Sequence, residues 1–219
     1  MTGSALQLRR LPRSFFARPV LDVAPDLIGC VLAHVTDEGR VAGRIVEAEA
    51  YGADDPGSHA ARGRTERNAP MFEKPGLAYV YFTYGMHFCF NIVTDEPGRA
   101  GAVLVRAVEP LDGIELMRAR RGAGIRDRDL ARGPGRLTQA FGIGREHNRA
   151  DLTKPPLLVY AGERFPSSAV VRTPRIGLGA VQDGRPWRFA LRASPWVSGP
   201  RAPTPLPAAP RARVSKRAR

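Results

Sequence analysis

The segment at residues 41–51 constrains the fold most, because its side chains alternate with a period of two. This alternation is typical of a β-strand whose two faces meet different surroundings. On this interpretation one face carries Ile45, Glu47, Glu49 and Tyr51. The opposite face carries the small apolar residues Val46, Ala48 and Ala50. Two carboxylates therefore project from the same side of one strand. By itself a Glu-x-Glu pair is more typical of a solvated strand face than of a catalytic site.

A second strand-like segment, residues 78–94, is dense in aromatic and β-branched side chains and is interrupted by Gly85. It predicts a β-hairpin whose bend lies at Tyr84-Gly85-Met86. Tyr79 and Tyr81 share one face, and Tyr84 stands at the bend. Four of the five tyrosines of the chain fall between residues 51 and 84. Such a cluster is more often a core or a protein interface than a base pocket, although the tip position of Tyr84 is hard to explain as core.

The remaining elements follow from apolar periodicity and from turn residues. Residues 21–35 predict a helix that leads into a strand, and residues 36–39 a turn. Residues 52–70 form a long polar loop that contains His59, and such loops are often functional. We expect a strand at 102–108 that ends at Pro110, helices at 113–121 and 133–141, and short strands within 157–197.

The charge favours a partner made of phosphates, because the chain carries +13. Six of these charges lie in residues 201–219, which leaves +7 for the rest, and an arginine-rich composition can also reflect coding bias. Cys30 and Cys89 lie in apolar runs and are expected as reduced, buried thiols. No apolar run is long enough to span a membrane, and the first 12 residues lack a secretory core. These features predict a cytoplasmic protein.

Four motifs occur in order between residues 43 and 143: GRIVEAEAYGADDPGSHAARGRTERNAPMF, KPGLAYVYFTYGMHFCFNIV, VLVRAVEPLDGIELM and GPGRLTQAFGI. Together they resemble the alkyladenine DNA glycosylases, also called 3-methyladenine DNA glycosylases. The likeness as a whole runs from about residue 18 to about residue 197 and ends in RFALRASPWVS. The resemblance implies a monofunctional DNA repair enzyme. Such an enzyme flips alkylated or deaminated purines out of duplex DNA and hydrolyses the N-glycosidic bond, which leaves an abasic site.

The resemblance also implies roles for individual residues. Glu49 matches the general base that activates the attacking water, and Arg106 matches the arginine that holds this water and the carboxylate. Three residues match those that contact the flipped base: Tyr51, His59 and Tyr81. Tyr84 matches the tyrosine that wedges into the duplex, and Asn91 matches the asparagine that crowds the pocket against the exocyclic amine of guanine. The richness of the His59 loop in Gly and Arg departs from the family pattern, which makes the stacking role of His59 less secure than the role of Glu49.

The strand pattern and the resemblance together predict an α+β fold. We expect a single mixed domain with a curved antiparallel β-sheet, a protruding β-hairpin and packed helices. Residues 1–16 are expected to form an N-terminal extension, residues 17–199 the glycosylase domain, and residues 200–219 a disordered basic tail.

No cofactor or metal is expected, since the ligand motifs of zinc deaminases are absent and His87 with Cys89 makes only half a zinc site. A strand-cutting lyase would need a pocket lysine, for which Lys74 is the only plausible candidate. The expected partner is double-stranded DNA with damaged purines, bound by a monomer. The alternative is a non-enzymatic nucleic-acid-binding module with a tyrosine stacking platform and arginine phosphate contacts.

Overall fold

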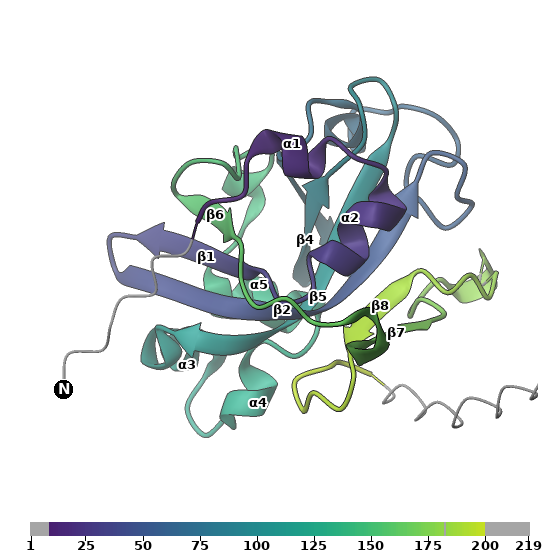
Figure 1. Cartoon of the computed structure of the whole chain (residues 1–219). Coiled ribbons are helices and arrows are strands. Elements are labelled where there is room, and N and C mark those ends of the chain that lie inside the picture. Colours follow the sequence, from purple (N-terminus) through teal and green to yellow (C-terminus); the bar gives the residue numbers. More distant parts are fainter. Residues whose placement is uncertain (1–8, 182, 200–219) are drawn as a thin grey trace, which may run out of the picture.

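The computed structural model describes residues 9–181 and 183–199. An eight-stranded antiparallel sheet forms its centre (Figure 1). The strand order is β3-β4-β5-β2-β1-β6, and β8 pairs with both β2 and β7. The strands are β1 (Val31–Thr36), β2 (Gly39–Gly52), β3 (Ala78–Thr83), β4 (His87–Val93), β5 (Gly101–Asp112), β6 (Leu157–Tyr160), β7 (Val170–Thr173) and β8 (Arg188–Leu191). The expected α+β fold with one antiparallel sheet is confirmed.

Five α-helices accompany the sheet within the described residues: α1 (Arg13–Phe16), α2 (Val20–Asp26), α3 (Ile114–Arg121), α4 (Asp127–Leu130) and α5 (Pro134–Phe141). The short 3-10 turns are η1 (Ala69–Phe72), η2 (Arg145–His147), η3 (Ser167–Ala169) and η4 (Gly179–Val181). Pro134 at the first turn of α5 and Gly142 in the left-handed conformation after its last turn fit the preferences of helix ends. No described helix has the length and apolar character that crossing a membrane requires.

The main core lies on one face of the sheet. Apolar side chains of α2 and α5, including Val23 and Phe141, pack there against strand residues such as Ala48, Ala50 and Val105. The other face carries a smaller cluster around Tyr79, Met71 and Ala102. The helices thus seal one side of β2 and β5, and the side chains on the opposite side of these strands are available to build a site.

The alternation along β2 is interrupted, which corrects the expected facing of Ile45 and Val46. Ile45 lies in the main core with Ala48 and Ala50, and Val46 lies in a separate cluster on the other side. The cause is a pair of register shifts between β2 and β5 on either side of Glu47. One shift makes Val46 an extra residue on β2, and the next makes Arg106 an extra residue on β5. Such bulges commonly re-aim side chains next to active sites.

Strand β5 runs past Pro110 to Asp112, so the expectation that Pro110 ends it is wrong. Proline is tolerated here because β4 pairs only with residues 102–104 of β5. Within the described residues Pro110 thus has a strand neighbour on the β2 side only, and its partner Gly43 lies next to a register shift. Proline is confined to such edges and bulges in sheets. The expected hairpin at 78–94 and the helices at 113–121 and 133–141 are confirmed.

The N-terminal part of the described chain packs closely on the domain. The Phe16 side chain is fully buried, and the Leu11 backbone N–H donates to the Val159 carbonyl at 2.9 Å. The division at residues 16 and 17 stays a prediction, as does the basic tail, which lies outside the described residues.

Candidate active site

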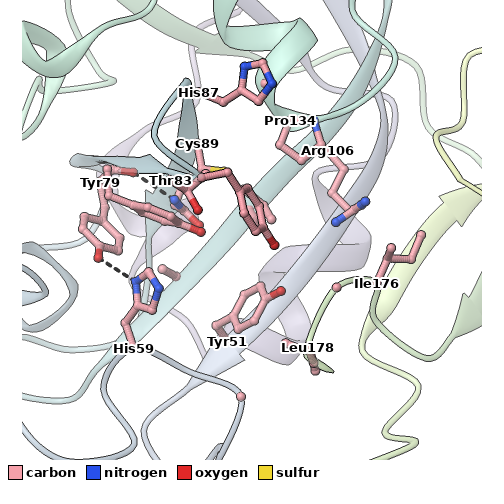
Figure 2. A pocket seen from close by; sticks show the side chains of 18 of the residues that line it. Tyr51, His59, Tyr79, Thr83, His87, Cys89, Arg106, Pro134, Ile176 and Leu178 are labelled. Carbon is pink, nitrogen blue, oxygen red and sulfur yellow. Dashed lines mark hydrogen bonds between the residues drawn. The ribbon is translucent and has the colours of Figure 1, made fainter. Parts of the chain in front are cut away.

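A pocket of about 480 Å³ opens on the sheet face opposite the main core (Figure 2). Its walls come from β2 to β5, from the loop that contains His59, from the start of α5 and from residues 176–181. The sequence-predicted residues among those that line it are Tyr51, His59, Tyr81, Tyr84, Asn91 and Arg106. Side chains more than 100 residues apart in sequence therefore meet in one cavity.

Glu49 lies at the back of this pocket, behind three residues that line it. Its side chain is fully buried. Oε2 accepts hydrogen bonds from the Tyr51 hydroxyl at 2.8 Å and from Arg106 Nη1 at 3.1 Å. Oε1 accepts one from the backbone N–H of Ile176 at 2.8 Å. All three contacts are donors, so the environment fits an ionised carboxylate, which can only accept.

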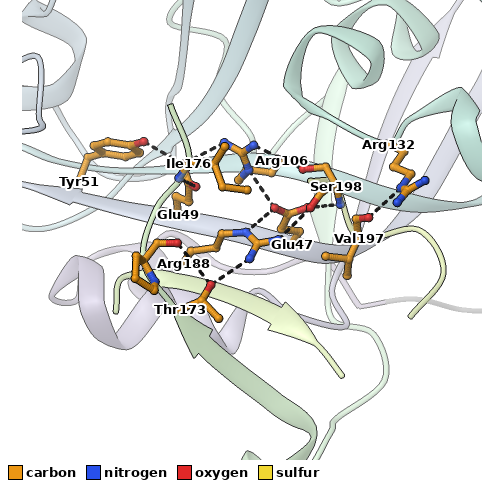
Figure 3. A network of polar contacts seen from close by, with 11 residues as sticks. Glu47, Glu49, Tyr51, Arg106, Arg132, Thr173, Ile176, Arg188, Val197 and Ser198 are labelled. Atoms are coloured by element: carbon orange, nitrogen blue, oxygen red, sulfur yellow. Dashed lines mark hydrogen bonds and ion pairs between the residues drawn. The ribbon is translucent and has the colours of Figure 1, made fainter. Parts of the chain in front are cut away.

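Arg106 joins Glu49 to a second buried carboxylate, Glu47 (Figure 3). Arg106 Nε donates to Glu47 Oε1 at 2.9 Å, and Arg188 Nε donates to the same oxygen at 2.7 Å. Two carboxylates and two guanidinium groups thus form a neutral set inside the protein. Burial alone would lower the pKa of Arg106, but the negative charges of Glu49 and Glu47 outweigh it and raise the pKa. Arg106 therefore stays charged at any physiological pH.

The last described residues complete this network. The Ser198 backbone N–H donates to Glu47 Oε2, and the Ser198 carbonyl accepts from Arg188 Nη2 at 2.9 Å. Arg132 Nε donates to the Val197 carbonyl at 2.8 Å. The segment around residue 198 is thereby fixed against the strand that carries the two glutamates.

Three aromatic rings, those of His59, Tyr79 and Tyr81, line another part of the pocket. The His59 ring centroid lies 4.5 Å from that of Tyr81, and His59 Nδ1 lies 2.8 Å from the Tyr79 hydroxyl. Burial, and then the charge of Arg67, lowers the pKa of His59, while burial raises the pKa of Tyr79 to about 12. A neutral His59 that accepts a hydrogen bond from the Tyr79 hydroxyl fits both shifts.

Tyr51 faces this group from β2, and its hydroxyl stays protonated. Burial raises the pKa of Tyr51, and the negative charge of Glu49 raises it further. Because the hydroxyl donates to Glu49, one side chain both bounds the pocket and contacts the carboxylate behind it.

Asn91 lies on the floor of the pocket and is almost fully buried. Its Nδ2 donates to the Tyr79 carbonyl at 3.0 Å, which fixes the amide plane across the β3–β4 ladder. Cys89, two residues earlier, is a buried free thiol whose pKa is raised by burial. The expected reduced state of Cys30 and Cys89 is consistent with two buried thiols.

Tyr84 stands at the rim, at the tip of the hairpin. It is 78% exposed and has φ of +52°, and the neighbouring Gly85 has φ of +65°. Three residues connect β3 to β4, and the Met86 backbone N–H donates to the Thr83 carbonyl at 3.3 Å. This bond closes a β-turn whose two central residues, Tyr84 and Gly85, both have positive φ. The turn therefore holds a large ring in solvent, at the mouth of the pocket.

Sequence reasoning missed several residues that build the site. Arg188, Ile176 and the ion pair between Asp55 and Arg175 were not singled out, and the partner of Glu47 was unknown. Local sequence patterns cannot predict these contacts, because each one joins segments more than 100 residues apart. The alternation of β2 did place both glutamates on one face, and this prediction is confirmed by their shared contact with Arg106.

The sequence profile of the methylpurine-DNA glycosylase family matches residues 14–195. The chain belongs to this family. It is therefore a DNA N-glycosylase that acts on DNA, and the alternative of a non-enzymatic binding module is wrong.

Three curated relatives illustrate the similarity, and each carries 3-methyladenine DNA glycosylase as a provisional name. The protein of Streptomyces avermitilis is 49% identical over 89% of this chain and 93% of its own length. That of Carboxydothermus hydrogenoformans is 49% identical over 86% of this chain and 98% of its own. That of Burkholderia lata is 50% identical over 87% and 91%. The resemblance inferred from the four motifs is thus confirmed over most of the glycosylase.

Proposed function

We propose that this glycosylase excises 3-methyladenine and related alkylated purines from duplex DNA by direct hydrolysis with a water activated by Glu49. The observation that carries the proposal is the position of Glu49, a buried carboxylate held only by donors at the back of an aromatic pocket. The names of the relatives support 3-methyladenine as the substrate.

The contacts of Glu49 leave room for one water. A carboxylate offers about four lone-pair sites, and the described contacts use three of them. Tyr51, Arg106 and Ile176 all line the pocket, and we place a water at the fourth site on this side of the carboxylate. Such a water could lose a proton to Glu49 as it attacks the deoxyribose carbon, which is general base catalysis.

The aromatic rings suit a purine that carries a positive charge. Alkylation at N3 or N7 gives the base this charge, and a cation is favoured over the face of an electron-rich ring. Tyr51, His59 and Tyr81 supply such rings, and a neutral His59 adds no repulsion. The charged purine is also a better leaving group, so activated water can suffice without a covalent step.

The target base must leave the stack before it can enter this pocket, at a cost of a few kcal/mol. Tyr84, exposed at the rim, is positioned to enter the gap and to offset part of this cost. Asn91 would crowd a base that carries the exocyclic amine of guanine, and hypoxanthine, which lacks the amine, would still fit. We expect a monomer to act on duplex DNA.

We propose that the enzyme is monofunctional, which means that it excises the base and does not cut the strand. Among the described residues no lysine lines the pocket, and Lys74 is exposed outside it. A Schiff-base step would need such an amine.

Released bases identify the reaction most directly. Purified protein is incubated with methylated duplex and with a duplex that contains hypoxanthine, and the free bases are separated by chromatography. We expect free 3-methyladenine, intact strands with abasic sites, and no adduct after borohydride. The absence of any released purine, or a trapped covalent adduct, would contradict the proposal.

A further inference from the structure

A second buried ion pair lies beside the pocket and takes no part in the chemistry proposed above. The side chains of Asp55 and Arg175 both have no exposed surface. Arg175 Nη2 donates to Asp55 Oδ1 at 2.7 Å, and Nη1 donates to Oδ2, so the pair is bidentate. Burial alone would lower the pKa of Arg175, but hydrogen bonding and the charge of Asp55 raise it.

The Arg175 guanidinium also contacts the strand and the ring that form one pocket wall. Nη1 donates to the Ala50 carbonyl at 2.9 Å. The guanidinium carbon lies 4.6 Å from the centroid of the Tyr51 ring and 5.2 Å from that of Trp187. Arg175 thereby supports Tyr51, a residue that also donates to Glu49.

The two partners belong to segments that carry other parts of the site. Arg175 directly precedes Ile176, whose backbone N–H donates to Glu49. Asp55 lies four residues before His59, and its Oδ1 also accepts from the Gly57 backbone N–H at 2.9 Å. A Cβ at Gly57 would stand 2.9 Å from Arg175 Nη2, so a larger residue there would have to displace the guanidinium.

We infer that Asp55 and Arg175 are positioning residues for base excision: their ion pair fixes the Ile176 amide on Glu49, the Tyr51 ring and the loop that carries His59 in one arrangement. This inference rests on the proposed function of Glu49. Neither side chain needs to touch the purine or the water.

A contribution to the stability of the fold does not explain why these two charges are buried together. The desolvation of two buried charges consumes most of their attraction, so a buried ion pair often contributes no more than neutral packing of the same shape. Geometry is different, because misplacement of catalytic groups by about 1 Å can slow a reaction about 100-fold. The pair is therefore expected to affect the excision rate far more than the folded fraction.

The test separates the effect of the ion pair on the geometry of the site from the effect of its charges on stability. Asp55→Asn and Arg175→Gln each remove the nearest counter-charge of a buried side chain and should lower the melting temperature. The longer contacts of Arg175 with Asp183, at 3.8 Å, and of Arg185 with Asp55, at 4.0 Å, remain in the respective variants. The double variant Asp55→Asn/Arg175→Gln removes both charges and should recover most of that loss.

The control is Arg13→Gln/Asp151→Asn, which removes an ion pair of 2.7 Å that does not line the pocket. Single-turnover release of 3-methyladenine from methylated duplex is measured for all of them, with enzyme in excess.

We expect the double variant to melt near the wild type yet release the base about 100-fold more slowly, while the Arg13/Asp151 control excises normally. A double variant that regains the wild-type rate together with its stability would overturn the inference. Arg175→Lys provides a second arm, since it keeps the charge but cannot span Asp55, Ala50 and the Tyr51 ring. If the double variant does not fold, a normal rate for folded Arg175→Lys overturns the inference and a slow rate supports it.

Glu49→Gln distinguishes a failure of the positioning inference from a failure of the proposed function. If Glu49→Gln is inactive and the Asp55/Arg175 variants excise normally, only the positioning inference fails. If Glu49→Gln excises normally, the proposed function fails instead.

Discussion

Glu49 shows how a buried acid can be kept ready to accept a proton. Its contacts come from a tyrosine hydroxyl, a guanidinium and a backbone amide, and all three donate to the carboxylate. The guanidinium and the amide cannot accept, so they favour the ionised form. Arg106 is shared with Glu47, which is in turn neutralised by Arg188. Glu49 is thus paired with a cation, and no charge of this network is left without a counter-charge in the core. A buried charge without a counter-charge would destabilise the fold by several kcal/mol.

Tyr84 offers the clearest test at the scale of one residue. Tyr84→Ala should slow excision from duplex DNA about 10- to 100-fold, because a ring that offsets part of the unstacking cost is lost. Its effect on the free energy of unfolding should stay within about 0.5 kcal/mol, as for other exposed side chains. Single-turnover kinetics and urea unfolding measure the two quantities.

Tyr84→Phe is the matched control, since it keeps the ring and should keep most of the rate. Equal rates for Tyr84→Ala and the wild type would rule out a wedge at this position.

At the scale of elements, the sequence predicts what local patterns determine. The Gly85 hairpin, the strand that carries Glu47 and Glu49, and the helix begun by Pro134 follow from spacing of a few residues. The bulges on either side of Glu47 do not, because they depend on the register between β2 and β5, about 60 residues apart. The contacts of Asp55 with Arg175 and of Ile176 with Glu49 span 120 and 127 residues, so only the folded chain reveals them.

His34 links β1 to the end of α5 and makes a pH-dependent contribution. Its Nδ1 lies 2.7 Å from the Phe141 carbonyl, and burial lowers the pKa of its ring below the usual 6.5. The unfolded chain then binds a proton first as pH falls. The free energy of unfolding should therefore be fully retained above about pH 6.5 and decrease below it, by at most about 1.4 kcal/mol per pH unit.

Urea unfolding at pH 7.5, 6.5 and 5.5 checks this, with His34→Gln as the comparison because glutamine can still donate to Phe141 but does not titrate. The difference between the two proteins isolates His34 from the other histidines. Parallel pH dependences in both would show that His34 does not contribute.

At the scale of the whole molecule, the charge of +13 suits DNA, and six of the basic residues lie between residues 201 and 219. Each phosphate contact releases counterions, so deletion of 201–219 should reduce the salt dependence of binding, by up to about 5 in the slope of log K against log salt. Fluorescence anisotropy with undamaged duplex from 50 to 300 mM salt measures the slope. An unchanged slope would show that this segment does not contact DNA.

In the proposed reaction Glu49 activates the water while the rest of the site binds the base. Glu49→Gln tests it most directly, because the amide keeps the shape of the side chain and Arg106 still pairs with Glu47. Binding to methylated duplex and single-turnover release of 3-methyladenine are measured on the same preparation. We expect near-normal affinity with release slowed about 100- to 10,000-fold. Release at the wild-type rate would contradict it.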